Sequence, residues 1–400
     1  MKLKFKNFSS NKKKILLVIV LLILALISTI QIDFFASADT NETEENLSAS
    51  VYELLDDIDL SEIQTMVDSV DEMQLFQVSV KEKIESILKG EYFTNYQSLA
   101  SAIISLIFGD IRTILPFLFT LVATGLLCNL VGNLRSESKS VGDIINFVFL
   151  SVTILVVLVA FKNILSSTNN TLNLILNQMQ IFFPILITLL GTIGSISSIS
   201  IYNPLVAVLT GVVSLVFDKF LYPLFIVILI LTILGNLTDT IKLDKLNSFF
   251  SSTFKWTVGI VFTIFTGFLS IQGISAGKFD SVSIKATKFA MKSYIPIIGS
   301  YVSDGIDFFI LGAILIKNSI GLVGVIVLFI TILSPIITII IYKLALQLSS
   351  GILEMTGNSK ISNFLSSCSK ILTLPIVLII GISFMYIITI CLIMCTANIF

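Results

Sequence analysis

The residues best suited to chemistry lie in one charged stretch, residues 276–318, set between long apolar runs. Asp304 and Asp307 are three positions apart, and Lys317 and Asn318 follow about three helical turns later. Charged side chains within a membrane are costly and are usually paired or functional. These residues therefore predict either a polar lining along a water-filled path, or markers of the membrane surface and internal ion pairs.

Three lysines precede these charges on one face of a predicted helix. Lys285, Lys288 and Lys292 are spaced i, i+3 and i+7, and apolar residues take the other face, namely Val282, Ala286, Phe289 and Ala290. Such a helix can lie in the membrane interface with its lysines toward anionic headgroups. It can also dock an acidic partner, including the acidic segment of this same chain. The residues leave both interpretations open.

The sequence argues against an enzyme. It contains no histidine, which excludes His-based acid–base catalysis and zinc motifs of the HExxH type. Cys391 and Cys395 are four positions apart in an apolar run, and without a further ligand nearby we interpret them as small buried hydrophobes. No nucleotide-binding glycine loop and no nucleophile–base set is present. We expect neither catalysis, nor a cofactor, nor a metal site.

The elements that must position these charges are membrane helices. The chain is 55% hydrophobic and 13% charged, whereas soluble domains carry about 25% charged residues. We expect an all-α polytopic protein with about 6–8 spans. Short runs such as 203–217 could be half-helices or tilted partners. The apolar runs cover residues 111–132, 144–161, 172–194, 203–217, 221–237, 256–275, 319–342 and 371–396.

The first 38 residues have the pattern of a secretory signal. A lysine-rich start precedes an apolar run over 15–30, and Ala36-Ser37-Ala38 then matches a cleavage site. The alternative is a retained membrane anchor, for which this run is short. We therefore predict a signal peptide at 1–38, an acidic extracytoplasmic domain at 39–99 and a multi-pass membrane domain at 100–400.

The acidic domain holds 15 acidic and 3 basic residues over 39–99. Its apolar residues recur at helical spacing, which predicts two or three short amphipathic helices. Ser61 with Gln64 resembles a capping box, and Gly90 could end the last helix. So short a segment buries only a small core. Its apolar faces either pack on a partner, such as the membrane part, or form a self-contained hairpin.

Orientation follows from the positive-inside rule. Export of the acidic domain puts Arg135 and Lys139 inside, and Lys242 and Lys245 also fall inside if the intervening runs all cross. The same count puts Lys278 and the lysines after it outside, against the rule. One run is therefore re-entrant, or this basic stretch has a reason to face outward.

The stretch from Gln272 to Gly324 resembles the stage III sporulation protein AE family of endospore-forming bacteria. The pieces that match are Ile271-Gln272-Gly273, Asp280-Ser281-Val282-Ser283-Ile284-Lys285, Lys288-Phe289, Tyr294-Ile295-Pro296-Ile297-Ile298-Gly299, then Asp304, Asp307 and Lys317-Asn318-Ser319-Ile320-Gly321-Leu322. Within this block the candidate gate or docking residues are Gln272, Gly273, Lys285, Lys288, Pro296, Gly299, Asp304, Asp307, Lys317, Asn318 and Gly321.

The resemblance implies a membrane component, plausible as a gate or permease, of a channel between mother cell and forespore. It implies a place in the mother-cell membrane around the forespore. The implied partners are other membrane and ring-forming proteins of the same operon and a forespore membrane protein, with no nucleic acid. No catalytic residue comes with the family. Two alternatives stay open: a stand-alone secondary transporter of a small solute, and a non-conducting membrane scaffold of the complex.

Overall fold

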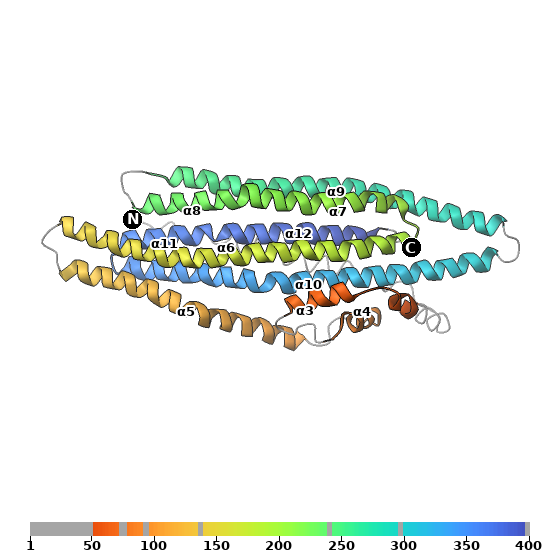
Figure 1. Ribbon diagram of the computed structural model, residues 1–400, viewed down its shortest axis with the longest axis horizontal. Helices are drawn as coiled ribbons and strands as arrows, with labels where there is room; N and C mark the ends of the chain where they lie inside the picture. The colour runs from red at the N-terminus through yellow and green to blue at the C-terminus, as the bar shows by residue number, and fades with distance from the viewer. Residues whose placement is uncertain are drawn as a thin grey trace, which may run out of the picture. The chain divides into compact units, whose positions relative to one another are not determined.

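The computed structural model describes residues 51–71, 78–90, 96–134, 139–237, 242–294 and 299–396. The chain forms two compact units, residues 1–53 and 54–400, and the helices below belong to the second (Figure 1). The predicted signal peptide lies outside the described residues. The helices are α3 (Ser61–Val70), α4 (Val80–Leu88), α5 (Tyr96–Leu134), α6 (Lys139–Thr192), α7 (Ile196–Val216), the π-helix η1 (Phe217–Leu221), α8 (Tyr222–Leu237), α9 (Asp244–Tyr294), α10 (Gly299–Met355), α11 (Ser359–Ile371) and α12 (Thr373–Cys395).

Three of these helices are longer than a membrane requires. α6, α9 and α10 contain 54, 51 and 57 residues, or about 75–85 Å at 1.5 Å per residue. The hydrocarbon core of a bilayer is only about 30 Å thick. Within the described residues, six helical segments are long and apolar enough to cross a membrane. The predicted all-α fold with about 6–8 spans is confirmed, and the excess length means that parts of these helices stand outside the bilayer.

The structure joins several of the predicted runs into single helices. Runs 144–161 and 172–194 both belong to α6. Runs 203–217 and 221–237 form one continuous helical path through the π-helix Phe217–Leu221, so of the two alternatives for 203–217, a half-helix or a tilted partner, the half-helix is wrong. The π turn lies just before Pro223, whose ring nitrogen cannot donate in an α-helical ladder.

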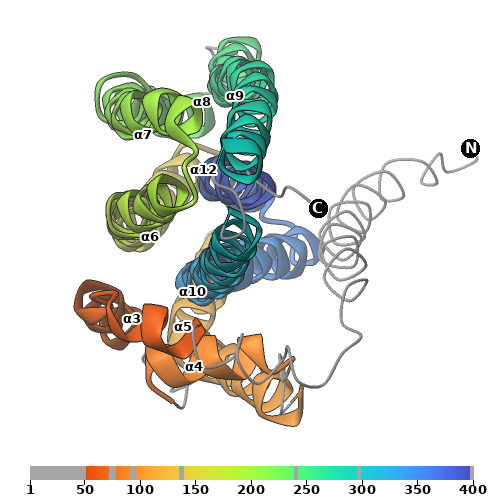
Figure 2. The ribbon, with the colours of Figure 1, turned by 90° about the vertical axis from the view of Figure 1, so that its right-hand side faces the viewer.

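α10 is the helix that most others contact. It packs against α3, α4, α5, α6, α9, α11 and α12. α12 lies beside it among α6, α9 and α10 (Figure 2), and because α12 is apolar all round, it suits an interior position. Two glycines of α10 face α12. A Cβ on Gly321 would lie 2.6 Å from Met394 Sδ, and one on Gly324 would lie 3.0 Å from atoms of Phe182, Ile390 and Tyr386.

The acidic helices pack on the membrane part. α3 contacts α6 and α10, and α4 contacts α10, so the first of the two alternatives for their apolar faces holds. The predicted capping box at Ser61 is wrong, because Gln64 Oε1 instead accepts a hydrogen bond from the Val80 amide at 2.7 Å. The capping box is at Ser79 and Glu82, at the start of α4. Gly90 ends that helix with a φ of 79°, as predicted.

The α10–α12 contact gives a testable expectation. Gly324→Leu should force Phe182 and Ile390 apart and lower the stability of the bundle by about 1–3 kcal/mol, the usual cost of overpacking. Thermal unfolding of the detergent-purified protein measures this effect. Gly259→Leu is the matched control, since a Cβ on Gly259 in α9 meets no atom within 4 Å. Equal melting temperatures for the two variants would contradict close α10–α12 packing.

Candidate functional site: a buried polar layer at one end of the helix bundle

The best-defined polar site lies where α7 begins and α12 ends. α6 ends in a tight corner in which Gly194 has a φ of 87° and the Ser195 amide donates to Leu190 O at 2.9 Å, so that α7 starts at Ile196. The first amides of a helix have no partner within it, and Ser195 supplies no side-chain cap here. These amides therefore need an acceptor from elsewhere in the fold.

Asp280 of α9 supplies that acceptor. Its two carboxylate oxygens accept hydrogen bonds from the amides of Ser197 and Ser198, each at 2.9 Å. The Asp280 side chain is buried, with 1% of its surface exposed. A buried carboxylate is normally expensive, but the start of a helix carries about half a positive charge. Asp280 thus caps α7 and gains partial neutralisation of its own charge.

Lys317 of α10 supplies hydrogen-bond donors to the end of α12. Its ammonium group donates to the carbonyl oxygens of Met394, at 3.0 Å, and of Thr396. The side chain is fully buried. The last carbonyls of a helix lack intrahelical partners and carry partial negative charge. Lys317 is therefore held by backbone carbonyls and a helix end.

Tyr202 joins the two caps. Tyr202 is a buried residue of α7, and its hydroxyl oxygen lies 3.0 Å from Thr396 Oγ1. The Thr396 hydroxyl itself donates to Leu392 O at 2.7 Å, which leaves Tyr202 as the donor in the bond between them. We call Asp280, Ser197, Ser198, Tyr202, Thr396 and Lys317 the polar layer. It couples the start of α7 and the end of α12 to α9 and α10.

The candidate residues predicted from sequence divide between this layer and other places. Lys317 is in it, and Gly321 lies one turn away at the α12 contact. Asn318 and Asp307 are half-buried on α10, and Lys285 is exposed on α9. Gln272, Gly273 and Lys288 are on α9, while Gly299 and Asp304 are in the first turns of α10. Pro296 lies outside the described residues.

Sequence reasoning did not select Asp280, Tyr202 or Thr396 as site residues. A signal existed for Asp280, which is the one acidic residue between Asp244 and Asp304 in a stretch rich in lysine. Nothing comparable marks Tyr202 or Thr396, because their partners come from helices distant in sequence.

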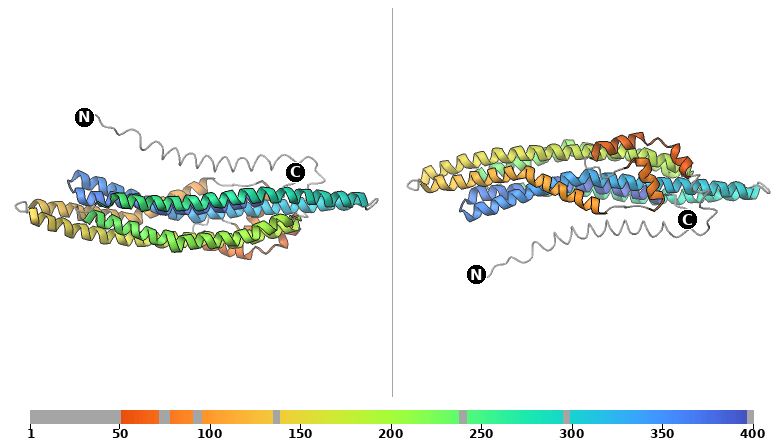
Figure 3. Two further views of the ribbon diagram at one scale, coloured as in Figure 1. Left: turned by 90° about the horizontal axis from the view of Figure 1, so that it is seen from above. Right: turned by 90° about the horizontal axis from the view of Figure 1, so that it is seen from below.

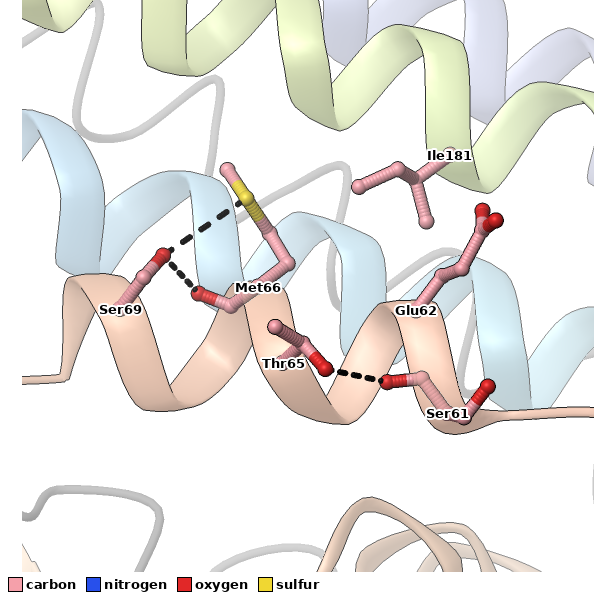
Figure 4. Close-up of a pocket in the computed structure, with 6 residues that line it drawn as sticks. All are labelled: Ser61, Glu62, Thr65, Met66, Ser69 and Ile181. Atoms are coloured by element: carbon pink, nitrogen blue, oxygen red, sulfur yellow. Dashed lines mark hydrogen bonds between the residues drawn. The ribbon is translucent and has the colours of Figure 1, made fainter.

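Other candidates carry less chemistry. A hollow between α3 and α6 is lined by Ser61, Glu62, Thr65, Met66, Ser69 and Ile181. Met66 and Glu62 point from α3 toward α6 (Figure 4). Because most of the lining belongs to one short helix, we regard this hollow as the join between α3 and α6.

Cys391 is half-buried and Cys395 exposed, so the predicted burial of the pair is wrong for Cys395. No cluster suited to a metal ion occurs among the described residues.

The comparisons with known proteins agree on one family. The model of the family described as stage III sporulation protein AE matches residues 78–397. The stage III sporulation protein AE of Bacillus subtilis (strain 168) is 23% identical over 298 residues, which cover 74% of this chain and 75% of that relative. No solved structure matches this chain. The family match includes every residue of the polar layer.

The Asp280 cap predicts the effect of removing one charge. Asp280→Asn keeps the size of the side chain but turns one acceptor into a donor that faces an amide. We expect a loss of about 1–3 kcal/mol, seen as a lower melting temperature and faster hydrogen exchange at Ser197 and Ser198. Lys285→Gln, on the exposed face of the same helix, is the control. Unchanged exchange at both serines in Asp280→Asn would show that the cap is not needed.

The Tyr202–Thr396 bond can be isolated by a double-mutant cycle. Tyr202→Phe and Thr396→Val each remove one partner, and the pair should be coupled by about 1 kcal/mol. Unfolding of the two single variants and the double variant in the same detergent gives the coupling. Strict additivity would mean that this bond does not connect α7 to α12 energetically.

Proposed function

The chain belongs to the stage III sporulation protein AE family, and from that premise we propose that it is the gate subunit of a channel between mother cell and forespore. The six candidate spans among its described residues, together with its family, make it a multi-pass membrane protein involved in sporulation. The further proposal, that this subunit opens and closes a path, has its main support in the polar layer.

The layer has the properties that a gate needs. α7 and α12 both have an end in it, and those ends are held by Asp280 and Lys317. Contacts between a charge and a helix end can break without unfolding either helix, because the intrahelical hydrogen bonds are separate from them. We propose that the closed state has both caps formed. In the open state the ends of α7 and α12 move away and leave Asp280 and Lys317 to line a hydrated path.

The polar residues at the start of α10 fit the same proposal. Asp304 and Asp307 precede Lys317 on one helix, and a path through the layer would continue past them. We propose that this first part of α10 forms its outer mouth. The negative charge of Asp304 and Asp307 would raise the local concentration of cations and basic solutes at this entrance.

We propose that the N-terminal helices lie on the extracytoplasmic side, in the space between the two membranes. α3 packs on α6 near Ile181, in the half of α6 that leads to the polar layer. In this orientation the end with Lys242 and Lys245 faces the cytoplasm, as the positive-inside rule requires. The layer then faces the side on which ring-forming partners of the same operon and a forespore membrane protein would assemble.

A flux measurement in liposomes tests the gate. Lys317→Met and Asp280→Asn should each raise the leak of a small fluorescent solute from liposomes by about tenfold, because one cap is lost. Lys255→Met, an exposed lysine of α9, should leave the flux unchanged. No flux in the wild type or in either variant would instead favour a non-conducting scaffold. Flux driven by an ion gradient in the isolated protein would favour a secondary transporter.

The same variants can be followed during sporulation. We expect both to reduce spore yield while the protein remains in the membrane at wild-type amounts, and we expect Asp304→Ala and Asp307→Ala to act in the same direction. Immunoblots of membrane fractions control for protein loss. Normal spore yield in all four variants would argue against a gating role for this region.

A further inference from the structure

The second half of α9 carries an apolar stripe that no described helix covers. Phe279, Val282 and Phe289 are 70%, 68% and 73% exposed, and Ala286 between them is exposed too. Their spacing of three, four and three residues is that of a and d positions in a heptad repeat. An exposed apolar surface of this kind indicates an interaction site. We call these four residues the α9 stripe.

The stripe lies beyond the reach of the protein's own bilayer. Five charged residues fall between positions 278 and 292 of α9, namely Lys278, Asp280, Lys285, Lys288 and Lys292, and so many charges are too costly for the hydrocarbon core of a bilayer. α9 and α10 run side by side past the start of α7 and the end of α12 (Figure 3). A helix that lies in the membrane interface must be parallel to the membrane plane. This segment continues a spanning helix, so lipids of its own membrane do not cover the stripe.

The other face of this segment is already used. Ile284 is buried, and a Cβ on Gly194 at the α6–α7 corner would lie 3.8 Å from its Cγ1 atom. Asp280 caps α7. The segment is therefore fixed on the bundle with the stripe turned away from it, and a partner could bind without displacing the polar layer.

The charges beside the stripe select the partner. Lys278, Lys285 and Lys292 share one heptad position, the g position that flanks the stripe. Residues 281–294 contain no acidic side chain. If two copies of this segment paired in antiparallel orientation, the lysines of one would face the lysines of the other. In parallel orientation the lysines would face Ser283 and Ala290, which offer no charge attraction. Self-association is thus disfavoured.

We propose that the α9 stripe is the docking site for an acidic amphipathic helix of another protein. The partner helix places apolar residues against Phe279, Val282 and Phe289 and acidic residues against the three lysines, as in a heterotypic coiled coil. Complementary charge at such flanking positions determines the choice and orientation of the partner. This inference does not depend on gating, because the stripe and the polar layer use opposite faces of α9.

A designed peptide tests the chemistry directly. The probe is a fluorescent three-heptad helix with leucine and isoleucine at a and d and glutamate at e and g, titrated against the full-length protein in nanodiscs of neutral lipid. The triple variant Lys278→Glu, Lys285→Glu and Lys292→Glu should lose at least about tenfold in affinity and gain affinity for the lysine version of the peptide. The matched control reverses Lys242, Lys245 and Lys255, which lie near the start of α9.

The apolar part of the site is tested separately. Val282→Asp and Phe289→Asp change exposed residues and should keep the wild-type melting temperature, yet each should abolish binding of the acidic peptide. Equal affinity of the acidic peptide for the wild type and the stripe variants would overturn the proposal. Dimers that form in the nanodisc through residue 282 would overturn it in favour of a second copy of this chain.

Photo-crosslinking in sporulating cells tests the natural partner. A photoreactive phenylalanine at position 282 or 289 should cross-link to a segment of another protein whose sequence has apolar heptads flanked by Asp and Glu. The same residue at Phe249, on the exposed face of the spanning part of α9, should give no such product. Cross-links from 282 that reach only lipid, or only this same chain, would contradict the proposal. Phe289→Asp should lower spore yield but leave liposome flux unchanged. This combination separates loss of the partner from loss of the gate.

Discussion

The fold depends on how two helix ends are satisfied inside a bundle. α7 begins, and α12 ends, against neighbouring helices where water cannot bind all of the free amides and carbonyls. Asp280 accepts from the first, and Lys317 donates to the second. Each charged group is buried at acceptable cost because the helix end beside it has the opposite partial charge. Each helix end is in turn fixed to a helix that continues beyond it.

α10 sets the axial register of its neighbouring helices along the bundle. Between membrane helices no hydrophobic force selects a register, because lipid tails are as apolar as leucine. Polar contacts from α10 set the register instead. Thr331 receives a hydrogen bond from Gln178 of α6, Thr338 donates to Asp110 of α5, Lys343 donates to Thr373 of α12 and Ser350 bonds with Ser362 of α11. α10 therefore fixes the axial register of four neighbouring helices.

The great length of α9 and α10 carries both helices past the polar layer. α9 and α10 pass the polar layer and continue to Tyr294 and back from Gly299. This places the exposed α9 stripe outside the polar layer and leaves the layer at its base. The proposed gate and the proposed docking site would then use opposite faces of one helix, so that a partner could bind without displacing the polar layer.

The sequence by itself determined the class of the protein. Apolar runs that long, with so few charges, can only be helices in a bilayer, and the block from Gln272 to Gly324 pointed to the family. Local patterns were less reliable where they were short, as the capping box at Ser79 rather than Ser61 shows. The polar residues between runs 144–161 and 172–194 hid the continuity of α6, because a helix can continue through a polar stretch without a break.

Only the tertiary structure decided what the charges do. Lys317 stood out in the sequence as a costly charge, but its partners are the carbonyls of Met394 and Thr396, and a backbone carbonyl has no signature in the sequence. Asp280 is bound by the amides of Ser197 and Ser198, about eighty residues earlier. Residue types predict that a buried charge must be compensated. They do not reveal which helix end compensates it, because that depends on where separate helices stop in space.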